Sequence, residues 1–591
     1  MSQPQQQVIT PVKLAGIGLA AVLATASQAQ EFRTLDGSNN NLANPTLGQA
    51  GTNLLRLTDP AAGYADGFQE PVGEALRGSP RAISNAVSRQ SGLVNNHRHL
   101  SSWVWQWGQL LDHDLDLTEV AAPLEPLPVT VPADDPLFAP GAVIPVNRFR
   151  YDPATGTGPG NPRLHPNALT HYIDASVVYG SDAARANALR AFTGGRLAVD
   201  DSAGVGDLLP NNAAGMPNDP GPGGIFGRGP GGLPPEEQFL AGDARANEQA
   251  ALAAAHTVLV REHNRLADAI AAAAPALDDE AIYRRARAIV GAQLQAITYN
   301  EWLPALLGQG VVDDLIGRYA GYDPLEDPRV SAEFSTAGFR IGHTLLIPDL
   351  LRLRADGSAI AAGHLPLRDA FFVPDAIRAH GIEPLLRGLA AAPAQEIDTR
   401  VVEDVRSFLF GPPGPGVGGF DLVAINIQRG RDLGLADYNS ARAAFGLDPV
   451  TSFADITGDP GLQLALADAY GGNIDNIDLF IGMLAEDHLP GASVGELLAH
   501  ILADQFRRAR DADRFFYLND PFFIDELGLL QQIGATLDDI NATTLAALLR
   551  RNMRSGDGFF QDAVFFIAQV PAPASGLLLA LGLILLHRRR R

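Results

Sequence analysis

The chain has no cysteine among its 591 residues. This absence excludes disulfide bonds, iron–sulfur clusters, thiolate ligands to iron and zinc sites built from cysteine. It does not assign a cellular compartment, because a chain of this length can bury a large core without disulfide bonds.

Basic residues are also scarce. The 44 lysines and arginines stand against 67 aspartates and glutamates, which gives a net charge of −23. A protein that binds nucleic acid needs a basic face to neutralise phosphates, so we expect no nucleic-acid partner. The acidic excess is compatible with bound cations and with a soluble exported protein. Hydrophobic residues make up 46% of the chain, which predicts a globular fold rather than disorder.

The N-terminus has the pattern of a signal peptide. An apolar run over residues 14–25 follows Lys13, and Ser27 and Ala29 form a small-residue cleavage pattern. We therefore predict a signal peptide over residues 1–29. The alternative is an ordinary N-terminal helix.

The C-terminus combines a proline-containing segment (570–575), an apolar run (576–586) and an arginine cluster (588–591). The apolar run is shorter than the roughly 20 residues that span a bilayer. This order resembles the PEP-CTERM sorting tail of Gram-negative bacteria, so residues 567–591 are predicted to anchor the protein transiently before cleavage. The alternative is a permanent membrane anchor. Both interpretations predict an exported protein, located in the extracellular matrix or the cell envelope or secreted.

Between its two ends the chain has mostly helical patterns. Apolar residues recur with helical periodicity over residues 248–274, 279–307 and 493–511. Glycine and proline interrupt the pattern at 200–235 and at 411–419, which predicts irregular loops there. Strand signals are few and short. The sequence therefore predicts a mainly α fold.

Residues 107–118, WGQLLDHDLDLT, hold the densest group of chemically useful side chains. On a helix, Gln109 and His113 are four residues apart and share a face, with Asp112 beside it. Asp114 turns away from that face. One helix is thus predicted to present a general base and its hydrogen-bonding neighbour to a cavity, and a carboxylate to a different site.

A second motif spans residues 170–176, where oxygen-bearing side chains alternate. They are Thr170, Tyr172, Asp174 and Ser176. Several hard oxygen ligands in one loop suit Ca²⁺, and Asp114 is the predicted remote contributor. The alternative, which the pattern alone favours, is a half-exposed strand with alternating polar residues.

The segment 241–248 leads into a predicted helix. Arg245 and Glu248 are three apart and are predicted to share a helical face, where a surface ion pair is the simpler interpretation. His256 and His263, on the same helix, are interpreted as structural histidines rather than ligands.

Two further segments combine glycine, histidine and polar residues within apolar surroundings. His343 follows Gly342 and is either a core histidine or an axial ligand of iron. In the segment 425–432, Asn426 could accept a hydrogen bond from an imidazole N–H, and Arg429 could pair with a carboxylate.

These motifs, in this order, resemble the animal-type haem peroxidases of the peroxidase–cyclooxygenase superfamily. The resemblance runs from about Phe32 to about Phe566 and so covers nearly the whole processed chain. It implies one large, mainly α domain over residues 30–566, with haem buried between core helices. The lack of cysteine and the C-terminal tail fit a bacterial, peroxicin-like branch.

The resemblance also implies a role for each matching residue on the peroxide side of the haem. His113 matches the distal histidine, Gln109 its neighbour and Arg245 the catalytic arginine. Asp112 and Glu248 match the two carboxylates that can form ester links to the haem, which is expected to be haem b.

On the other side of the haem, His343 matches the proximal iron ligand and Asn426 the residue that forms a hydrogen bond with it. Arg340 and Arg429 resemble partners of the haem propionates. The residues that match the calcium site are Asp114, Thr170, Tyr172 (through its carbonyl), Asp174 and Ser176.

The implied activity is oxidation of bromide, iodide, thiocyanate or phenolic donors by hydrogen peroxide, through a ferryl intermediate. Gln249 stands where some relatives carry a methionine that makes a sulfonium link to haem, so chloride is a poorer candidate. The first alternative is a fatty-acid dioxygenase on the same scaffold, but its radical-forming tyrosine position is Arg340 here. The second alternative is a matrix-associated binding protein without turnover, which the complete set of site residues disfavours.

Overall fold

The computed structural model describes residues 30–218, 233–413, 419–554 and 561–567. The predicted signal peptide, nearly all of the predicted tail and the centre of the loop at 200–235 lie outside these ranges. The chain divides into two units, Met1–Glu31 and Phe32–Arg591. All elements described below belong to the second unit.

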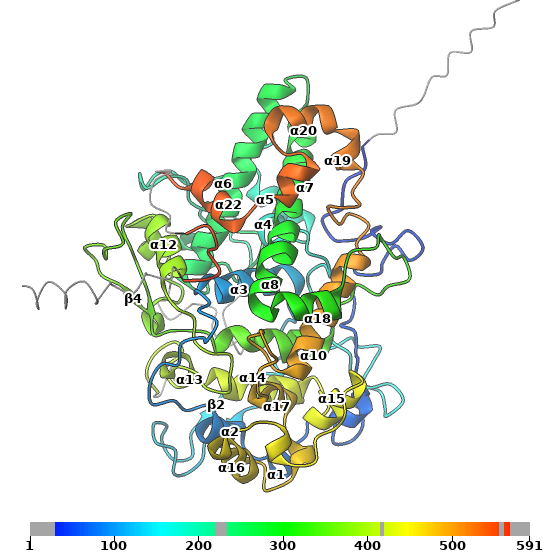
Figure 1. Ribbon diagram of the computed structural model, residues 1–591, viewed down its shortest axis with the longest axis vertical. Helices are drawn as coiled ribbons and strands as arrows, with labels where there is room; N and C mark the ends of the chain where they lie inside the picture. Colours follow the sequence, from blue (N-terminus) through cyan, green and yellow to red (C-terminus); the bar gives the residue numbers. More distant parts are fainter. Residues whose placement is uncertain (1–29, 219–232, 414–418, 555–560, 568–591) are drawn as a thin grey trace, which may run out of the picture. The chain divides into compact units, whose positions relative to one another are not determined.

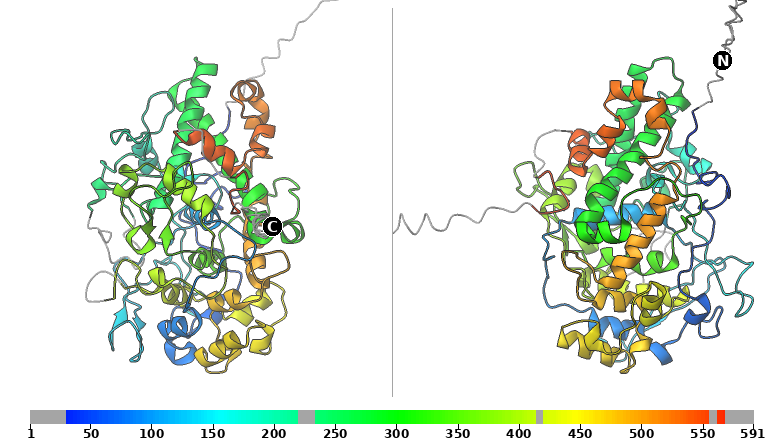
Figure 2. Two further views of the ribbon diagram at one scale, coloured as in Figure 1. Left: turned by 60° about the vertical axis from the view of Figure 1, so that its left-hand side comes forward. Right: turned by 45° about the vertical axis from the view of Figure 1, so that its right-hand side comes forward.

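Helices dominate this unit (Figures 1 and 2), and the prediction of a mainly α fold with few short strands is confirmed. Within the described ranges the strands form two small antiparallel sheets. In the first, β1 (Val129–Thr130) pairs with β2 (Val143–Ile144), and in the second β3 (Asp349–Leu350) pairs with β4 (Leu365–Pro366). The longer helices are α2 (Pro80–Val87), α3 (Trp103–Leu115), α5 (Ala183–Leu189), α6 (Ala250–Ala273), α7 (Asp279–Ile297), α12 (Glu383–Ala391), α14 (Leu422–Asp432), α15 (Tyr438–Ala444), α16 (Pro460–Ala469), α17 (Leu479–Ala485), α18 (Glu496–Asp511), α20 (Leu527–Ile533) and α22 (Leu545–Asn552).

Helix α3 lies in the interior of this unit (Figure 1). It contacts α6, α12, the short helix α4 (Ser176–Tyr179) and the 3-10 helix Gly338–His343. Trp103 and Trp107 of α3 are each 1% exposed. Because neighbours surround α3, both its apolar side chains and several of its polar ones are buried, and the polar ones must find partners in the interior.

Side-chain caps fix where the helices that build the interior begin. Gln249 caps α6 by accepting a hydrogen bond from the backbone N–H of Ala251 at 2.6 Å. Asp278 caps α7, and Asp421 caps α14. Such caps satisfy backbone N–H groups that the helix itself cannot pair. The cap at Gln249 ends the irregular segment 241–249 directly beside α3.

Two predicted helix ranges differ from the structure. The predicted helix over residues 279–307 is interrupted, because α7 ends at Ile297 and a π-helical turn, Thr298–Trp302, precedes α8 (Leu303–Leu307). The prediction that Arg245 and Glu248 share a helical face is wrong, because α6 begins only at Ala250. Residues 241–249 instead form turns that are held against α3 by tertiary contacts, which override local periodicity.

Within the described ranges no helix is long and apolar enough to cross a membrane. The apolar run at 576–586, which the sequence predicts as the core of a tail anchor, lies outside those ranges. The anchor therefore stays a prediction.

Candidate active site

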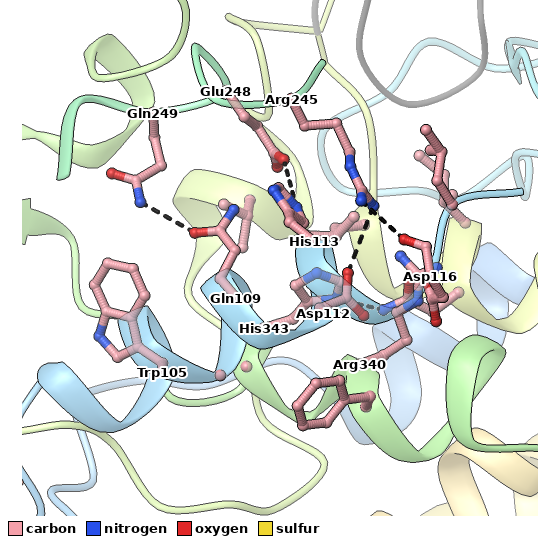
Figure 3. A pocket seen from close by; sticks show the side chains of 18 of the residues that line it. Trp105, Gln109, Asp112, His113, Asp116, Arg245, Glu248, Gln249, Arg340 and His343 are labelled. Carbon is pink, nitrogen blue, oxygen red and sulfur yellow. Dashed lines mark hydrogen bonds and ion pairs between the residues drawn. The ribbon is translucent and has the colours of Figure 1, made fainter. Parts of the chain in front are cut away.

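A cavity of about 480 Å³ lies between α3, the segment 241–249, the 3-10 helix Gly338–His343 and α14 (Figure 3). Side chains from all four elements line it. Among the residues predicted for the site, the cavity-lining ones are Gln109, Asp112, His113, Arg245, Glu248, Arg340, His343, Asn426 and Arg429. The tertiary structure thus brings together residues that are up to 320 positions apart in the sequence.

His113 is 3% exposed and presents its two ring nitrogens to different surroundings. Nδ1 is buried without a hydrogen bond, 3.5 Å from Oδ1 of Asp243. Nε2 lies 3.7 Å from Oε2 of Glu248, which lines the cavity. Burial, aided by the nearby charge of Arg245, holds the pKa of His113 well below its usual value. The imidazole is therefore neutral at neutral pH, the form that can accept a proton.

Arg245 is held in one orientation by acceptors on two sides, and Figure 3 shows it beside Asp112 and Asp116. Its Nε and Nη2 donate to the two carboxylate oxygens of Asp243 at 2.9 and 3.0 Å. Nη2 also donates to the backbone carbonyl of Asp116 at 2.8 Å. A bidentate contact of this kind fixes the plane of the guanidinium as well as its position. The remaining nitrogen, Nη1, lies 3.7 Å from the Asp112 carboxylate.

Asp112 lines the cavity next to a second buried carboxylate. Its Oδ1 is buried and makes no hydrogen bond. Burial and the neighbouring Asp116 raise the pKa of Asp112 to about 8. Asp116 is 1% exposed and caps the C-terminal end of α3, and burial raises its pKa as well. Burial therefore favours the protonated form within the Asp112–Asp116 pair, which titrates as a unit.

Gln109 and Gln249 connect α3 to the start of α6. The amide nitrogen of Gln249 donates to the side-chain oxygens of Gln106 at 2.7 Å and Gln109 at 3.1 Å. Its oxygen accepts the capping bond of α6. The hydrogen bonds of this one side chain thus fix α3, the distal helix that carries His113, relative to the segment that carries Arg245 and Glu248.

His343 ends the 3-10 helix Gly338–His343, and its Nδ1 lies 2.8 Å from the Asn426 amide of α14. Nε2 makes no hydrogen bond within the described residues. Burial and the charge of Arg340 lower the pKa of His343 to about 3, so the ring is neutral. A neutral imidazole with one nitrogen fixed by a partner is prepared to ligate a metal through the other.

Two arginines line the same region of the cavity. Arg340 donates from Nε to the carbonyl of Ser335 at 3.0 Å. Arg429 donates to the carbonyl of Asn147, lies 3.7 Å from Asp432 and has its guanidinium 3.8 Å from the centre of the Phe149 ring. The predicted pairing of Arg429 with a carboxylate is thus present, although the contact is a long one.

A second polar centre lies on the other face of α3. Asp114 accepts hydrogen bonds from the backbone N–H groups of Asp174, Ala175 and Val177 at 3.0–3.2 Å, and from the Ser176 hydroxyl at 2.9 Å. The separation of Asp114 from the face of His113, which the helical spacing predicts, is therefore present in the structure.

All residues of the segment 170–176 are buried, and the segment forms a loop that leads into α4. The alternative of a half-exposed strand is therefore wrong, because the loop packs against α3. Thr170 Oγ1 and Asp174 Oδ2 are buried without hydrogen-bond partners. Burial, together with Asp174, raises the pKa of Asp114 to about 7. Two buried carboxylates and orphaned oxygens at one point are the chemistry that a hard cation satisfies.

The structure adds two residues to which the sequence assigned no role, Asp243 and Asp116. Both contact Arg245, and Asp243 also lies beside His113. An acidic residue two positions before an arginine was the only available signal for Asp243.

His263 has both ring nitrogens bonded, to the Tyr179 hydroxyl and the Gly195 carbonyl, which agrees with its interpretation as structural.

Comparisons with known proteins agree with this geometry. The family profile described as animal haem peroxidase matches residues 32–565. Peroxinectin A of Dictyostelium discoideum is 35% identical over 559 residues, covering 92% of this chain and 97% of the relative. Thyroid peroxidase of Sus scrofa is 36% identical over 548 residues, covering 84% of this chain and 57% of the relative. The peroxidasin homolog of Mus musculus is 35% identical, but the chain spans only 38% of its length.

Solved structures show the same relationship. Peroxidase A of Dictyostelium discoideum has a TM-score of 0.80 at 34% identity, covering 91% of this chain and all of that one. A fatty acid alpha-dioxygenase of Arabidopsis thaliana has a TM-score of 0.70 at 19% identity, which shows a likeness of fold alone. The chain therefore belongs to the animal haem peroxidase family and is an enzyme of the haem peroxidase class.

Proposed function

We propose that the protein is an exported peroxidase that uses hydrogen peroxide to oxidise small anions, such as bromide, iodide and thiocyanate, or phenolic donors. One observation carries the proposal. A neutral general base, His113, and a neutral histidine fixed by an amide, His343, line one cavity together with the fixed cation Arg245.

The cavity residues fit a haem. Nε2 of His343 is unpartnered and can ligate iron, and the contact of Asn426 with Nδ1 sets the orientation of the ring. The amide nitrogen of Asn426 faces Nδ1 in the structure. For Nδ1 to carry the hydrogen and leave the Nε2 lone pair for iron, the amide must turn so that its oxygen faces Nδ1. Arg340 and Arg429 supply cations for two propionates.

Bound haem would supply the redox chemistry, accepting two oxidising equivalents from peroxide and passing them to the donor. His113 accepts a proton from peroxide at Nε2 and returns it to the departing oxygen. Arg245 stabilises the negative charge that develops on that oxygen as the O–O bond breaks. Asp243 fixes the Arg245 guanidinium through two hydrogen bonds and lies 3.5 Å from Nδ1 of His113, so little reorganisation of the arginine is needed during the reaction.

We also propose ester links from Asp112 and Glu248 to the haem. Both carboxylates line the cavity, and one oxygen of Asp112 has no competing hydrogen bond. Extraction of haem with acidified organic solvent tests this: ester-linked haem stays with the protein, and Asp112→Asn together with Glu248→Gln should release it.

Gln249 cannot form a sulfonium link to haem. We therefore propose bromide and iodide, rather than chloride, as the halide substrates.

Calcium is proposed for the centre formed by Asp114, Thr170, the Tyr172 carbonyl, Asp174 and Ser176. The orphaned oxygens of Thr170 and Asp174 support it. Because Asp114 is directly adjacent to His113, a bound cation would hold the distal helix in position. Metal analysis of the purified protein should give one Ca²⁺ per chain, and Asp174→Asn should lose it.

The location and origin of the protein are proposals as well. A signal peptide at 1–29, a transient PEP-CTERM-like anchor at 567–591 and a bacterial, peroxicin-like branch follow from the sequence patterns. Expression in a Gram-negative host, with and without residues 567–591, followed by fractionation and N-terminal sequencing, tests export, cleavage after Ala29 and anchoring.

The enzymatic function is tested by loading the full chain with haem and measuring a Soret band and peroxide-dependent oxidation of iodide and bromide. His113→Ala should keep the Soret band and lose most peroxide reactivity. Oxygen uptake with linoleate tests the dioxygenase alternative, which is disfavoured because no tyrosine in the described ranges lines the cavity. A protein that binds haem but oxidises no donor would support the non-catalytic alternative.

A further inference from the structure

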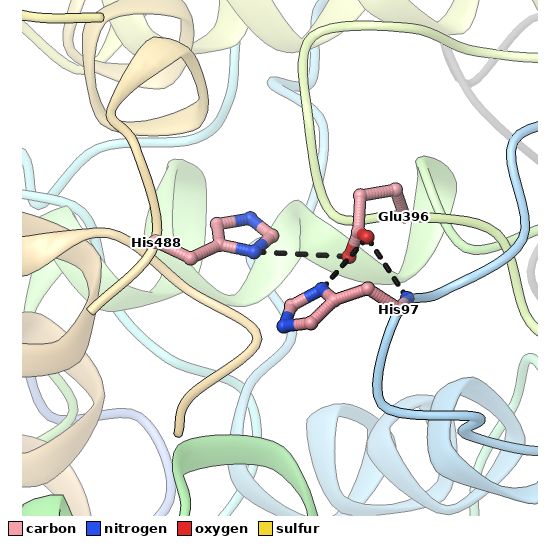
Figure 4. A group of neighbouring side chains, drawn as sticks. All are labelled: His97, Glu396 and His488. Carbon is pink, nitrogen blue, oxygen red and sulfur yellow. Dashed lines mark hydrogen bonds and ion pairs between the residues drawn. The ribbon is translucent and has the colours of Figure 1, made fainter. Parts of the chain in front are cut away.

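Two histidines and a glutamate meet outside the active-site cavity (Figure 4). His97 precedes α3, Glu396 follows α12, and His488 lies between α17 and α18. One ligand atom from each residue lies within 4.8 Å of the others. Segments nearly 400 residues apart in the sequence therefore place two imidazoles and a carboxylate at one point of the fold.

The Glu396 carboxylate is held in position by the segment before α3. Oε1 accepts a hydrogen bond from the Asn96 side chain at 2.8 Å, and Oε2 accepts one from the backbone N–H of His97 at 3.0 Å. The backbones of Asn95 and Gln395 are paired at the same place. Nδ1 of His97 lies 2.9 Å from Oε2. The carboxylate thus has a fixed orientation and still has lone pairs available.

His488 has its protonation pattern set by a backbone group. Its Nε2 lies 2.7 Å from the carbonyl oxygen of Ile397, which can only accept, so Nε2 carries the hydrogen. In a neutral ring Nδ1 then has a lone pair. This Nδ1 lies 3.7 Å from Oε1 of Glu396, so two acceptors face each other without a donor between them. Metal-ligating histidines characteristically donate their other N–H to a carbonyl in this way.

The spacing suits a small cation. Bonds of about 2.0 Å to nitrogen and oxygen in a tetrahedral site separate the ligand atoms by roughly 3.3 Å. The Glu396 and His488 side chains are only 16% and 17% exposed, whereas His97 is 52% exposed and can adjust its ring. Two imidazoles with one carboxylate favour divalent transition metals over Ca²⁺ or Mg²⁺, which prefer oxygen ligands.

We propose that His97, Glu396 and His488 bind one divalent transition-metal ion, with Zn²⁺ as the representative ion and water in the open position. The ion would join the connection between α17 and α18 to the segment before α3. It would also bear on the active site, because the backbone N–H of Gln395, next to Glu396, donates to the carbonyl of Leu345, which lines the cavity near His343.

The test is a titration of metal-free, full-length protein with Zn²⁺, in buffer that contains saturating Ca²⁺, followed by Co²⁺ as a spectroscopic probe. We expect one Zn²⁺ per chain, a Co²⁺ absorption spectrum of low coordination number, and a rise in the melting temperature on metal binding. His97→Ala is the first variant, because its exposed side chain contributes little to folding. It should weaken Zn²⁺ binding at least about 10-fold, and His488→Ala and Glu396→Gln should weaken it similarly.

His380→Ala is the matched control, because His380 is an exposed histidine outside this cluster and should leave binding unchanged. The proposal is refuted if the wild-type protein binds no Zn²⁺ under these conditions. It is equally refuted if His97→Ala binds Zn²⁺ as tightly as the His380 control. Because no step involves haem, these outcomes are independent of peroxidase activity.

Discussion

Asp243→Asn is the substitution that best tests how the distal cavity works, because Asp243 contacts both groups that act on peroxide. It accepts two hydrogen bonds from the Arg245 guanidinium and one from the Arg245 backbone N–H, and it lies 3.5 Å from His113. An asparagine keeps one acceptor oxygen but turns an NH₂ group toward the guanidinium. One of the two charge-assisted bonds is lost and the other becomes neutral.

The size of the effect follows from these contacts. A hydrogen bond to a charged group contributes about 1.5–3 kcal/mol. If most of this serves to place the guanidinium against the departing oxygen, kcat/KM for hydrogen peroxide should fall about 10- to 100-fold, since each tenfold corresponds to about 1.4 kcal/mol. The Soret band should be unchanged, because His343 and Asn426 are untouched.

The assay is stopped-flow reaction of the haem-loaded variant with peroxide, with urea unfolding measured in parallel. Asp478→Asn is the matched control: Asp478 makes a similar two-point contact with Arg431 at 3.0 and 2.7 Å, in a buried site that does not line the cavity. Both variants should lose stability, but only Asp243→Asn should slow the reaction with peroxide. A rate within twofold of wild type for Asp243→Asn, or an equal loss in the control, would refute the reasoning.

Three further predictions follow from individual contacts. Asn426→Ala should retain haem but lower activity about 10- to 100-fold, measured by iodide oxidation, because the orienting partner of His343 is removed; unchanged activity would contradict that role. The proposed calcium site predicts that a chelator broadens the Soret band and slows the peroxide reaction of the wild-type protein, whereas Asp174→Asn should show the slow rate before chelation and no further change. Burial raises the pKa of Glu301 to about 7. The folded state therefore keeps a proton that the unfolded chain releases above about pH 4.5. As a result, the free energy of unfolding should fall as the pH rises from 4.5 to 7. Glu301→Gln keeps an acceptor for the Leu545 N–H and should be about 1–2 kcal/mol more stable than wild type at pH 8 but not at pH 4.5, allowing for the partial exposure of the group; equal urea midpoints at pH 8 would contradict this.

The distal helix shows how far local pattern can predict a site. The spacing of Gln109, His113 and Asp114 placed the first two on one face and the third on another, and the structure agrees. The helix is buried, so its polar residues need partners in the interior. The helical repeat alone determines on which face of the helix each of these side chains lies.

Predictions from local sequence pattern were wrong where long-range contacts determine the backbone conformation. Spacing predicted a helical face for Arg245 and Glu248, but Gln249 caps α6 and leaves both residues in turns held against α3. Alternation favoured a half-exposed strand at residues 170–176, but Asp114 binds three backbone N–H groups of residues 174–177 and draws the segment into the interior as a loop.

The sequence by itself determined the mainly α architecture and the two faces of α3, because helical periodicity is a local property. It assigned the cavity residues only through their resemblance to a known family. Only the tertiary structure decided that Asp243 rather than Glu248 is the ionic partner of Arg245, and that His97, Glu396 and His488 meet at all. The physical reason is that these contacts join segments whose separation in the chain carries no information about their distance in space. They form when burial of the surrounding apolar surface brings the segments together.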